Sequence, residues 1–262
     1  MRALPRLLGP IALTLLLAAC SARQSQQVNG AAPTRTPLVV GTTDTTPPYA
    51  FRRGDEIVGL EPELAMELGY DLGRPVQFVV LPWDDLLNAV ARGDVDIAMN
   101  GITVTRERED RFAFGKPYTR AKLAAMVRRE DLTRFSKRAV ACSNPIDTGV
   151  VGGTTGESRL RSRCPAMIPR LYPTVRDAVR ELGQYRIDGV VHDAPVLAWY
   201  AAQSSDFAII PIPDSEEPLA WVFSLDNSYL RARADESLDR MRSGGTLERL
   251  LTRWIPASAR SR

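Results

Sequence analysis

A few reactive side chains limit the chemistry open to this chain of 262 residues. It holds one histidine, His192, and three cysteines, Cys20, Cys142 and Cys164. A single imidazole rules out a site with several histidine ligands, and three thiols rule out a four-cysteine zinc site. His192 is therefore the only candidate for imidazole acid–base chemistry. We expect no metal ion and no other cofactor.

Two loop segments carry groups that suit an anion. Arg108 lies in the loop after the apolar run at 96–99, and its planar guanidinium can offer a carboxylate two parallel N–H donors, which lysine cannot. Thr154 and Thr155 follow a glycine pair and precede a helical pattern, where backbone N–H groups without helical partners attract negative charge. The plain alternatives are a surface arginine and an ordinary strand-to-helix turn.

From Pro37 onward, short apolar runs alternate with helical patterns. This alternation predicts an α/β fold whose mainly parallel sheets are covered by helices, arranged as two lobes with a cleft between them. Ligands bind such sheets at the carboxyl ends of the strands, so the loops there are the places to search. The predicted strands are 38–41, 76–81, 96–99, 121–127, 149–151, 188–191, 208–212 and 221–224. The predicted helices are 61–72, 83–91, one from Glu157, 175–182, 194–203 and a pair within 227–254 divided by Gly244-Gly245.

The first 19 residues have the pattern of an export signal. Two arginines precede an apolar stretch that is too short, and too interrupted by Gly9 and Pro10, to span a membrane, which takes about 20 apolar residues. The segment 1–19 ends in Leu17-Ala18-Ala19-Cys20, which resembles the lipobox of bacterial lipoproteins, where the cysteine is lipidated; an ordinary secretory peptide is the alternative. Residues 20–37 are rich in small polar residues and proline, so we expect a flexible tether.

Export also changes how the cysteines and the charge are interpreted. Once Cys20 is acylated, Cys142 and Cys164 are an even pair in an oxidising compartment. A disulfide between them would close a loop of about 22 residues and stabilise the fold by about 3 kcal/mol, whereas two buried free thiols are the alternative. The formal charge of +3 falls close to zero without the arginines of the leader, so net charge gives no reason to expect nucleic acid as a partner.

Six motifs follow one another in the first half of the chain. They are Val39-Val40-Gly41-Thr42-Thr43-Asp44, Gly59-Leu60-Glu61-Pro62-Glu63-Leu64-Ala65, Trp83-Asp84-Asp85-Leu86, Gly93-Asp94-Val95-Asp96-Ile97, Gly101-Ile102-Thr103-Val104-Thr105-Arg106-Glu107-Arg108 and Phe112-Ala113-Phe114-Gly115-Lys116-Pro117-Tyr118. Their order and spacing resemble those of the family 3 bacterial solute-binding proteins, the polar amino-acid receptors of ABC importers. With the Gly-Thr-Thr-Gly-Glu turn and the Asp188 strand, the resemblance covers 38–256.

The resemblance implies a class II type periplasmic-binding-protein fold, two α/β lobes joined by two hinge strands. Lobe 1 would comprise 38–126 and 221–257, lobe 2 would comprise 127–220, the hinges would lie near 126–129 and 214–219, and 258–262 would form a tail. It also implies a free amino acid as ligand and, as partners, an ABC permease with its cytoplasmic ATPase. We expect a monomeric periplasmic or cell-surface lipoprotein, held at the membrane by lipid on Cys20.

The resemblance also assigns ligand-binding roles. Arg108 and Thr103, with Thr154 and Thr155 from the other lobe, would bind the α-carboxylate. Asp193 and carbonyl oxygens near Asn100 and Gly101 would bind the α-ammonium, although an aspartate before a helix is also a common cap. Trp83 would pack on the ligand side chain, or else in the core, and Asp44 would face the far end of the pocket, or else form a turn. Asp44, Glu61 and Glu63 favour a polar or basic ligand side chain, unless the glutamates only stabilise their helix.

Two alternatives share this fold. Gly152-Gly153-Thr154 and the segment 99–102 also resemble the periplasmic cyclohexadienyl (arogenate/prephenate) dehydratases, in which His192 beside Asp193 would serve as acid or base. The Asp-Ala-x-Glu motif of that group reads Asp193-Ala194-Pro195-Val196 here and lacks the acid, which favours a receptor without enzymatic activity. A lipoprotein that senses its ligand instead of feeding transport has no sequence feature against it.

Overall fold

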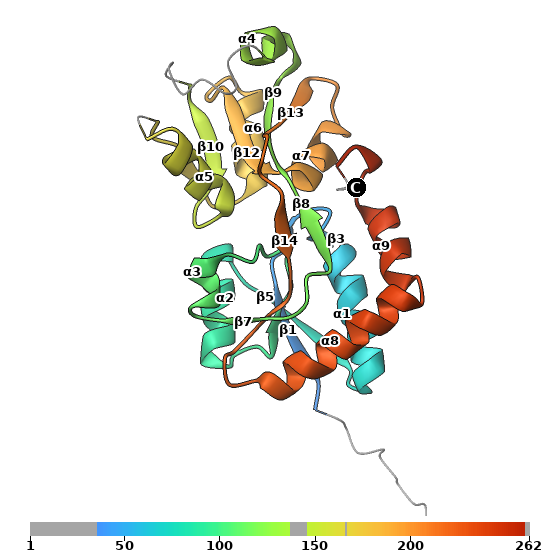
Figure 1. Ribbon diagram of the computed structural model, residues 1–262. Coiled ribbons are helices and arrows are strands. Elements are labelled where there is room, and N and C mark those ends of the chain that lie inside the picture. Colours follow the sequence, from blue (N-terminus) through green and yellow to red (C-terminus); the bar gives the residue numbers. More distant parts are fainter. Residues whose placement is uncertain (1–35, 137–145, 166, 260–262) are drawn as a thin grey trace, which may run out of the picture. The chain divides into compact units, whose positions relative to one another are not determined.

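The computed structural model describes residues 36–136, 146–165 and 167–259. The predicted signal peptide, Cys20 and Cys142 lie outside these residues. The described chain forms two five-stranded sheets with helices on both sides of each, which confirms the predicted two-lobed α/β fold (Figure 1). We call the part built on the sheet β5-β1-β6-β15-β7 lobe 1 and the part built on β11-β10-β12-β9-β13 lobe 2.

The sheet of lobe 1 is parallel at its centre. Strand β1 (Leu38–Thr42) is almost wholly buried and lies parallel to β5 (Val76–Val80) and β6 (Ile97–Ala98). Strand β15 (Val222–Phe223) comes from the far end of the chain and pairs antiparallel with β6 and with β7 (Ala113–Phe114). Because β1 and β6 run in the same direction, the loops that follow them meet at one edge of the sheet.

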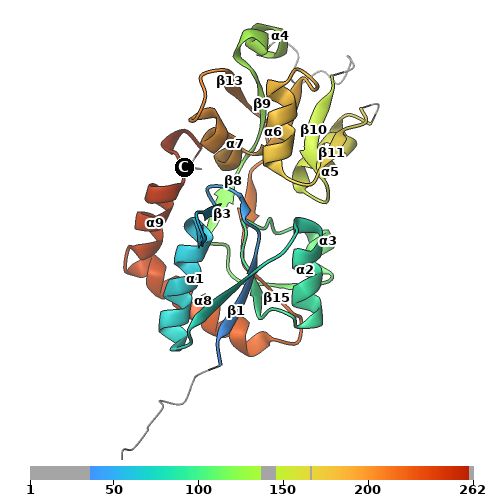
Figure 2. The same ribbon diagram turned by 180° about the vertical axis from the view of Figure 1, so that it is seen from behind.

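Amphipathic helices cover this sheet. Helices α1 and α2 lie on opposite sides of β1 (Figure 2), and α1 buries Leu60, Leu64 and Leu68 at helical spacing. A glycine at Gly245 takes a φ of 75° and divides the last two helices, as predicted. The helices are α1 (Leu60–Leu72), α2 (Trp83–Arg92), α3 (Arg106–Glu109), α8 (Ser228–Ser243), α9 (Thr246–Trp254) and the short 3-10 turn η2 (Ala257–Ala259).

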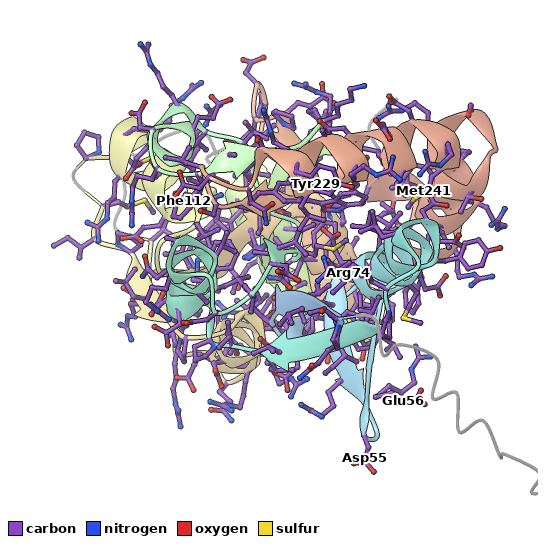
Figure 3. All side chains as sticks on the ribbon, turned by 90° about the horizontal axis from the view of Figure 1, so that it is seen from below. Asp55, Glu56, Arg74, Phe112, Tyr229 and Met241 are labelled. Atoms are coloured by element: carbon purple, nitrogen blue, oxygen red, sulfur yellow. The ribbon has the colours of Figure 1, made fainter. Side chains whose placement is uncertain are left out.

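A small antiparallel sheet between β1 and α1 was not predicted. It consists of β2 (Thr45–Thr46), β3 (Ala50–Arg53) and β4 (Glu56–Val58), with a cis peptide at Pro47-Pro48 in the connection. Asp55 and Glu56 lie at the outer tip of its hairpin (Figure 3). These strands have two to four residues, too few to give a clear period in the sequence.

Lobe 2 is built around β9 (Leu123–Arg128), which pairs antiparallel with β12 (Gly189–Asp193) and β13 (Phe207–Pro211). Strand β10 (Thr148–Val151) is parallel to β12 and to β11 (Arg170–Tyr172). The carboxyl ends of β10 and β12 therefore meet at one edge. The helices of this lobe are η1 (Arg129–Asp131), α4 (Leu132–Ser136), α5 (Thr155–Arg163), α6 (Val175–Gly183) and α7 (Ala194–Ala201).

The chain passes between the sheets along two paired strands. Strand β8 (Thr119–Ala121) lies antiparallel to β14 (Glu217–Leu219), and both join the lobes in Figure 1. The second crossing matches the expected segment 214–219. The first crossing lies before β9, earlier than the expected 126–129, because the apolar run assigned to lobe 1 forms its hydrogen bonds with β12 and β13 of lobe 2. Within the described part of the chain, no helix has both the length and the apolar character to cross a membrane.

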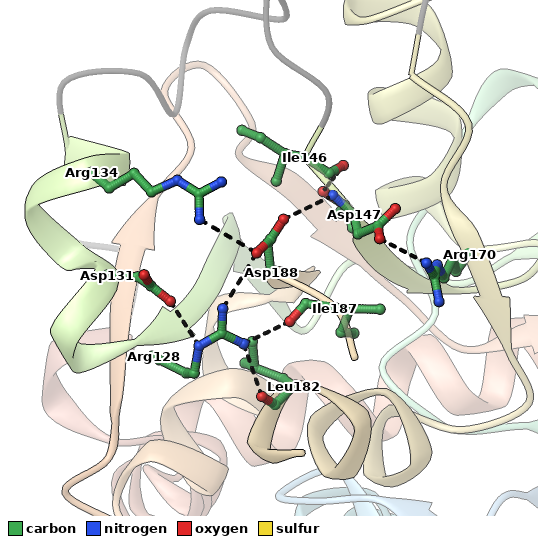
Figure 4. A network of polar contacts seen from close by, with 10 residues as sticks. Arg128, Asp131, Arg134, Ile146, Asp147, Arg170, Leu182, Ile187 and Asp188 are labelled. Carbon is green, nitrogen blue, oxygen red and sulfur yellow. Dashed lines mark hydrogen bonds and ion pairs between the residues drawn. The ribbon is translucent and has the colours of Figure 1, made fainter. Parts of the chain in front are cut away.

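Arg128 joins separate segments of lobe 2 (Figure 4). Its Nη1 donates to the carbonyl oxygens of Leu182, at 3.1 Å, and Ile187, at 2.7 Å, near the end of α6. Its other nitrogens lie 2.7 Å from Asp131 and 3.3 Å from Asp188. The Arg128 side chain is 9% exposed. One guanidinium thus donates to the carbonyl of Leu182 in the last turn of α6 and to that of Ile187 beyond it, and it neutralises two carboxylates.

We predict that Arg128→Ala lowers the free energy of unfolding by about 2–4 kcal/mol, because it removes a donor from the Ile187 carbonyl and the buried cation beside Asp131 and Asp188. Urea unfolding followed by circular dichroism measures the change. The matched control is Arg134→Ala, since Arg134 is 51% exposed and lies 3.5 Å from the same Asp188. We expect it to cost less than about 0.5 kcal/mol. Equal losses in the two variants would contradict the anchoring role of Arg128.

Candidate functional site

A pocket opens between the lobes where the carboxyl ends of β1, β6, β10 and β12 meet. It measures about 510 Å³, part of which is open to solvent. It lies at the carboxyl ends of strands, which is where ligands of such sheets bind. The residues that line it are Thr43, Thr45, Thr46, Trp83, Asn100, Gly101, Thr103, Arg108, Val151, Thr154, Thr155, Pro173, Thr174, Val175, His192 and Asp193.

Eight of the nine candidate ligand-binding residues lie in this lining. They are Trp83, Asn100, Gly101, Thr103, Arg108, Thr154, Thr155 and Asp193. Asp44 is not among the lining residues; its carboxylate lies 2.9 Å from Nε of Arg52, across the small sheet. The ligand-binding roles themselves stay predictions.

The sequence analysis missed several polar lining residues. Thr43, Thr45 and Thr46 directly follow β1, and Thr174 follows β11. Their place after strands was the available signal, but threonine is too common in such loops for the residue type to single them out. His192 also lines the pocket, whereas it had been considered only for the enzymatic alternative.

Arg108 is held in the pocket by both lobes. It lies in α3, whose N-cap Thr105 accepts a hydrogen bond from the Arg108 backbone N–H. Its Nη1 donates to the carbonyl of Thr103 at 2.9 Å, and its Nη2 donates to the carbonyl of Gly153, in lobe 2, at 3.1 Å. The guanidinium carbon lies 5.4 Å from the ring centre of Trp83. Burial lowers the pKa of Arg108, but a guanidinium still keeps its charge and has further N–H donors for an anion.

The start of α5 faces the same pocket from lobe 2. Thr154 is its N-cap by position, yet its hydroxyl donates to the Val151 carbonyl at 2.7 Å and makes no cap hydrogen bond. The Gly153 N–H, one residue earlier, donates to the carboxylate of Glu157 at 2.8 Å. The first N–H groups of α5 therefore receive no capping side chain from Thr154, which suits the expected contact with an anion.

Asp193 is buried at the end of β12. The pKa of Asp193 is raised from 3.8 to about 7, mainly by burial and also by the charge of Glu217, while the charge of Arg108 opposes this rise. Asp193 stands before α7, but its side chain makes no cap hydrogen bond, so capping does not explain this residue. A buried carboxyl that lies close to a guanidinium and makes no cap hydrogen bond is suited to a cationic group of a ligand.

His192 precedes Asp193 and is also buried. Its Nδ1 accepts the backbone N–H of Asp193 at 2.8 Å. Burial lowers the pKa of His192 from 6.5 to about 4, so its imidazole is neutral at neutral pH. With Nδ1 acting as acceptor, the proton is assigned to Nε2. His192 is therefore a neutral polar group of the pocket.

Three side chains of lobe 1 form a polar cluster, which we call the threonine–asparagine cluster. Thr43 Oγ1 donates to Asn100 Oδ1 at 2.9 Å and lies 2.9 Å from Thr46 Oγ1. Asn100 Nδ2 closes the cluster by donating to Thr46 Oγ1 at 3.4 Å. These contacts join the loop after β1 to the loop after β6 and fix the amide of Asn100.

Glu61 lies beneath these loops and is fully buried. Its Oε1 accepts hydrogen bonds from the Gly101 N–H at 2.7 Å and the Tyr118 hydroxyl at 2.5 Å, while its Oε2 accepts one from Trp221 Nε1 at 3.1 Å. Burial raises the pKa of Glu61, and the three donors oppose that rise. Glu61 is thus engaged in positioning the loop that contains Gly101. The ring of Tyr49 packs against this loop so closely that a Cβ on Gly101 would lie 2.5 Å from it.

The described residues contain no group of three His, Cys, Asp or Glu side chains arranged to hold a metal ion. The polar side chains of the lining are hydroxyls, an amide, an imidazole, one guanidinium and one carboxyl. Such a set suits an organic ligand that carries one charge of each sign.

Comparison with known proteins places this geometry in context. Residues 38–257 match the model of the bacterial extracellular solute-binding proteins, family 3. The L-cystine-binding protein TcyJ of Escherichia coli strain K12 is 24% identical over 222 residues, which cover 84% of this chain and 83% of TcyJ. The arginine-binding extracellular protein ArtP of Bacillus subtilis strain 168 is 25% identical over 253 residues, covering 95% of this chain and 96% of ArtP.

Solved structures show the same architecture. The ancestral amino acid-binding protein AncCDT-1, a precursor of cyclohexadienyl dehydratase, is 28% identical with a TM-score of 0.78 over 84% of this chain and 95% of that one. An ancestral arginine-binding protein bound to arginine is 26% identical with a TM-score of 0.75, over 85% of this chain and 100% of that one.

We predict that Glu61→Gln lowers the free energy of unfolding by about 1–3 kcal/mol, because an amide NH2 must then face one of the three donors around the carboxylate. Thermal or urea unfolding measures this. Glu63→Gln is the matched control: Glu63 lies two residues further along α1, is 33% exposed and pairs with Arg253, which is 57% exposed. We expect a change below about 1 kcal/mol for it. A Glu61→Gln protein as stable as the Glu63→Gln protein would contradict the positioning role.

Proposed function

The chain belongs to the bacterial extracellular solute-binding proteins of family 3, and we propose that it binds one free amino acid in the pocket between its lobes. One observation carries this proposal: the pocket contains one cationic and one anionic side chain, Arg108 from lobe 1 and Asp193 from lobe 2. A free α-amino acid carries a carboxylate and an ammonium on the same carbon. Its receptor therefore needs fixed groups of both signs close together.

In this proposal, Arg108 and Thr103 bind the α-carboxylate together with the N–H groups at the start of α5. Asp193 and the carbonyl oxygens near Asn100 and Gly101 bind the α-ammonium, and Trp83 packs against the ligand side chain. The ligand meets lobe 1 first, and lobe 2 then closes on it by a hinge motion at β8 and β14. Closure removes water from the charged groups and so strengthens each contact.

We further propose that the protein is held outside the cytoplasm by lipid on Cys20 and delivers its ligand to an ABC permease with a cytoplasmic ATPase. The family match and the lipobox motif support this proposal. Cys164, which ends α5, would pair with Cys142 in a disulfide, and residues 20–37 would act as the tether.

The similarity to a dehydratase precursor gives the enzymatic alternative its only support in the comparisons reported above, and that precursor is itself described as amino acid-binding. A general acid at neutral pH needs a pKa near 7, whereas burial holds the pKa of His192 at about 4. The position of the acid in the dehydratase motif is occupied by Val196, which is fully buried. The low pKa of His192 and the missing acid at Val196 therefore favour a binding protein.

Calorimetric titration of delipidated protein with the standard L-amino acids tests the proposal. We expect at least one dissociation constant below about 100 µM, and binding of none at this level would contradict the function. Arg108→Lys should weaken that binding at least about 100-fold, because an ammonium cannot offer the paired donors of a guanidinium. Arg106→Lys, an exposed change in the same helix, should leave binding unchanged and serves as the control.

We also predict that binding strengthens with pH. Burial raises the pKa of Asp193 to about 7, so in the empty pocket this carboxyl is mostly protonated at pH 6 and must lose its proton to pair with an ammonium. Between pH 6 and pH 8 the affinity should rise about tenfold, with proton release on binding. His192 does not titrate in this range because its pKa is about 4, and the guanidinium of Arg108 keeps its charge.

Calorimetry in two buffers of different ionisation enthalpy measures both the affinity and the released proton. Asp193→Asn, which has no carboxyl to ionise, should bind weakly and without dependence on pH. A wild-type affinity that is the same at pH 6 and pH 8 would contradict the assignment of Asp193 to the ammonium.

A further inference from the structure

The pocket lining carries one positive and one negative side chain, so its charges balance without any charge on the side chain of a ligand. Among the lining residues, Arg108 and Asp193 are the only ones with a charged side chain at neutral to mildly alkaline pH, since His192 is neutral. If the proposed function holds, an amino acid satisfies both with its own carboxylate and ammonium. We infer that the ligand is an amino acid whose side chain is polar but uncharged.

A third charge on the ligand would be buried without a partner. Taking a charged group out of water costs several kcal/mol unless an opposite charge or a full set of hydrogen bonds replaces the water. Arg108 and Asp193 are occupied by the α-carboxylate and α-ammonium. A lysine or arginine ligand would therefore lack a carboxylate for its side chain, and a glutamate or aspartate ligand would lack a cation.

The nearby acids are engaged elsewhere. Asp44 lies 2.9 Å from Arg52, and Glu63 lies 2.9 Å from Arg253. Neither belongs to the pocket lining.

Glu61 and Glu217 also lie outside the pocket lining. Glu61 accepts hydrogen bonds from the Gly101 N–H, the Tyr118 hydroxyl and Trp221. Glu217, in β14, acts electrostatically on Arg108 and Asp193 but is not among the lining residues. The carboxylates that favoured a basic ligand in the sequence are thus either paired with an arginine or hydrogen-bonded within the core.

The rest of the lining calls for a polar side chain. In the threonine–asparagine cluster the hydroxyl and amide donors bond to oxygens of the same cluster. This leaves spare acceptor positions on those oxygens and one amide N–H for a ligand. Thr45 and His192 add further polar groups, whereas the hydroxyl of Thr174 is engaged with Asp177 at the start of α6. A carboxamide or hydroxyl can pair with such groups, whereas an aliphatic side chain would leave them without partners at a cost in affinity.

The test is a calorimetric comparison of L-glutamine, L-asparagine, L-serine and L-threonine with L-arginine, L-lysine, L-glutamate and L-leucine. We expect at least one of the first four to bind at least about 100-fold more tightly than each of the last four. Equal or tighter binding of any of the last four would overturn the inference and leave the proposed function intact. Binding of none of the standard amino acids would instead overturn the proposed function, and this inference with it.

Two variants test the charge argument directly. Thr46→Asp adds a carboxylate to the lining, where Asn100 Nδ2 can donate to it, and should improve the affinity for L-arginine at least about tenfold while weakening that for the uncharged ligand. Asp44→Asn removes an acid next to the pocket that already pairs with Arg52, and should change the ratio of the two affinities less than about twofold. A loss of L-arginine affinity in Asp44→Asn would overturn the inference, because Asp44 would then serve the ligand. Thermal unfolding of both variants confirms that they are folded.

Discussion

The carboxylate of Glu61 joins the parts of the molecule that the pocket requires. It extends from the first turn of α1 to the Gly101 N–H, and it also accepts hydrogen bonds from Tyr118, directly before β8, and from Trp221, two residues after β14. One buried acid therefore fixes a pocket loop in relation to both crossings between the lobes. Burial of a carboxylate is costly, and here three donors offset that cost. The loop conformation consequently depends on an interaction that never reaches the pocket surface.

Desolvation of opposite charges explains why this arrangement suits a zwitterion. Burial lowers the pKa of Arg108 and raises that of Asp193, so both groups are less stable in their charged forms than they would be in water. A bound carboxylate and ammonium would relieve both effects at once. Arg108 comes from lobe 1 and already contacts the Gly153 carbonyl in lobe 2, so the side chain that we propose for the ligand carboxylate also joins the two lobes.

Long periodic segments and strand ends were predictable from the sequence. The apolar spacing of α1 and the glycine before α9 gave correct helices, and the strand-end rule placed Arg108, Thr154 and Asp193 at one site. The first crossing between the lobes lies earlier in the chain than expected, because an apolar run in the sequence does not show which strands it pairs with. The small sheet β2–β3–β4 and the role of Glu61 depend on contacts between distant segments, such as the one with Trp221, 160 positions further along the chain.

Ligand specificity is hard to predict from the sequence for the same reason: it depends on which side chains pair with one another in the fold more than on which residue types are present. Asp44 and Glu63 look like determinants of a basic ligand until Arg52 and Arg253 are seen beside them. An acid contributes to cation binding only where no protein cation already neutralises it and where it reaches the ligand. For this reason the ligands of relatives that are about a quarter identical do not transfer with the fold. A substitution at Arg52 would release the carboxylate of Asp44, which stands between the lining residues Thr43 and Thr45 in the chain, without altering a lining residue.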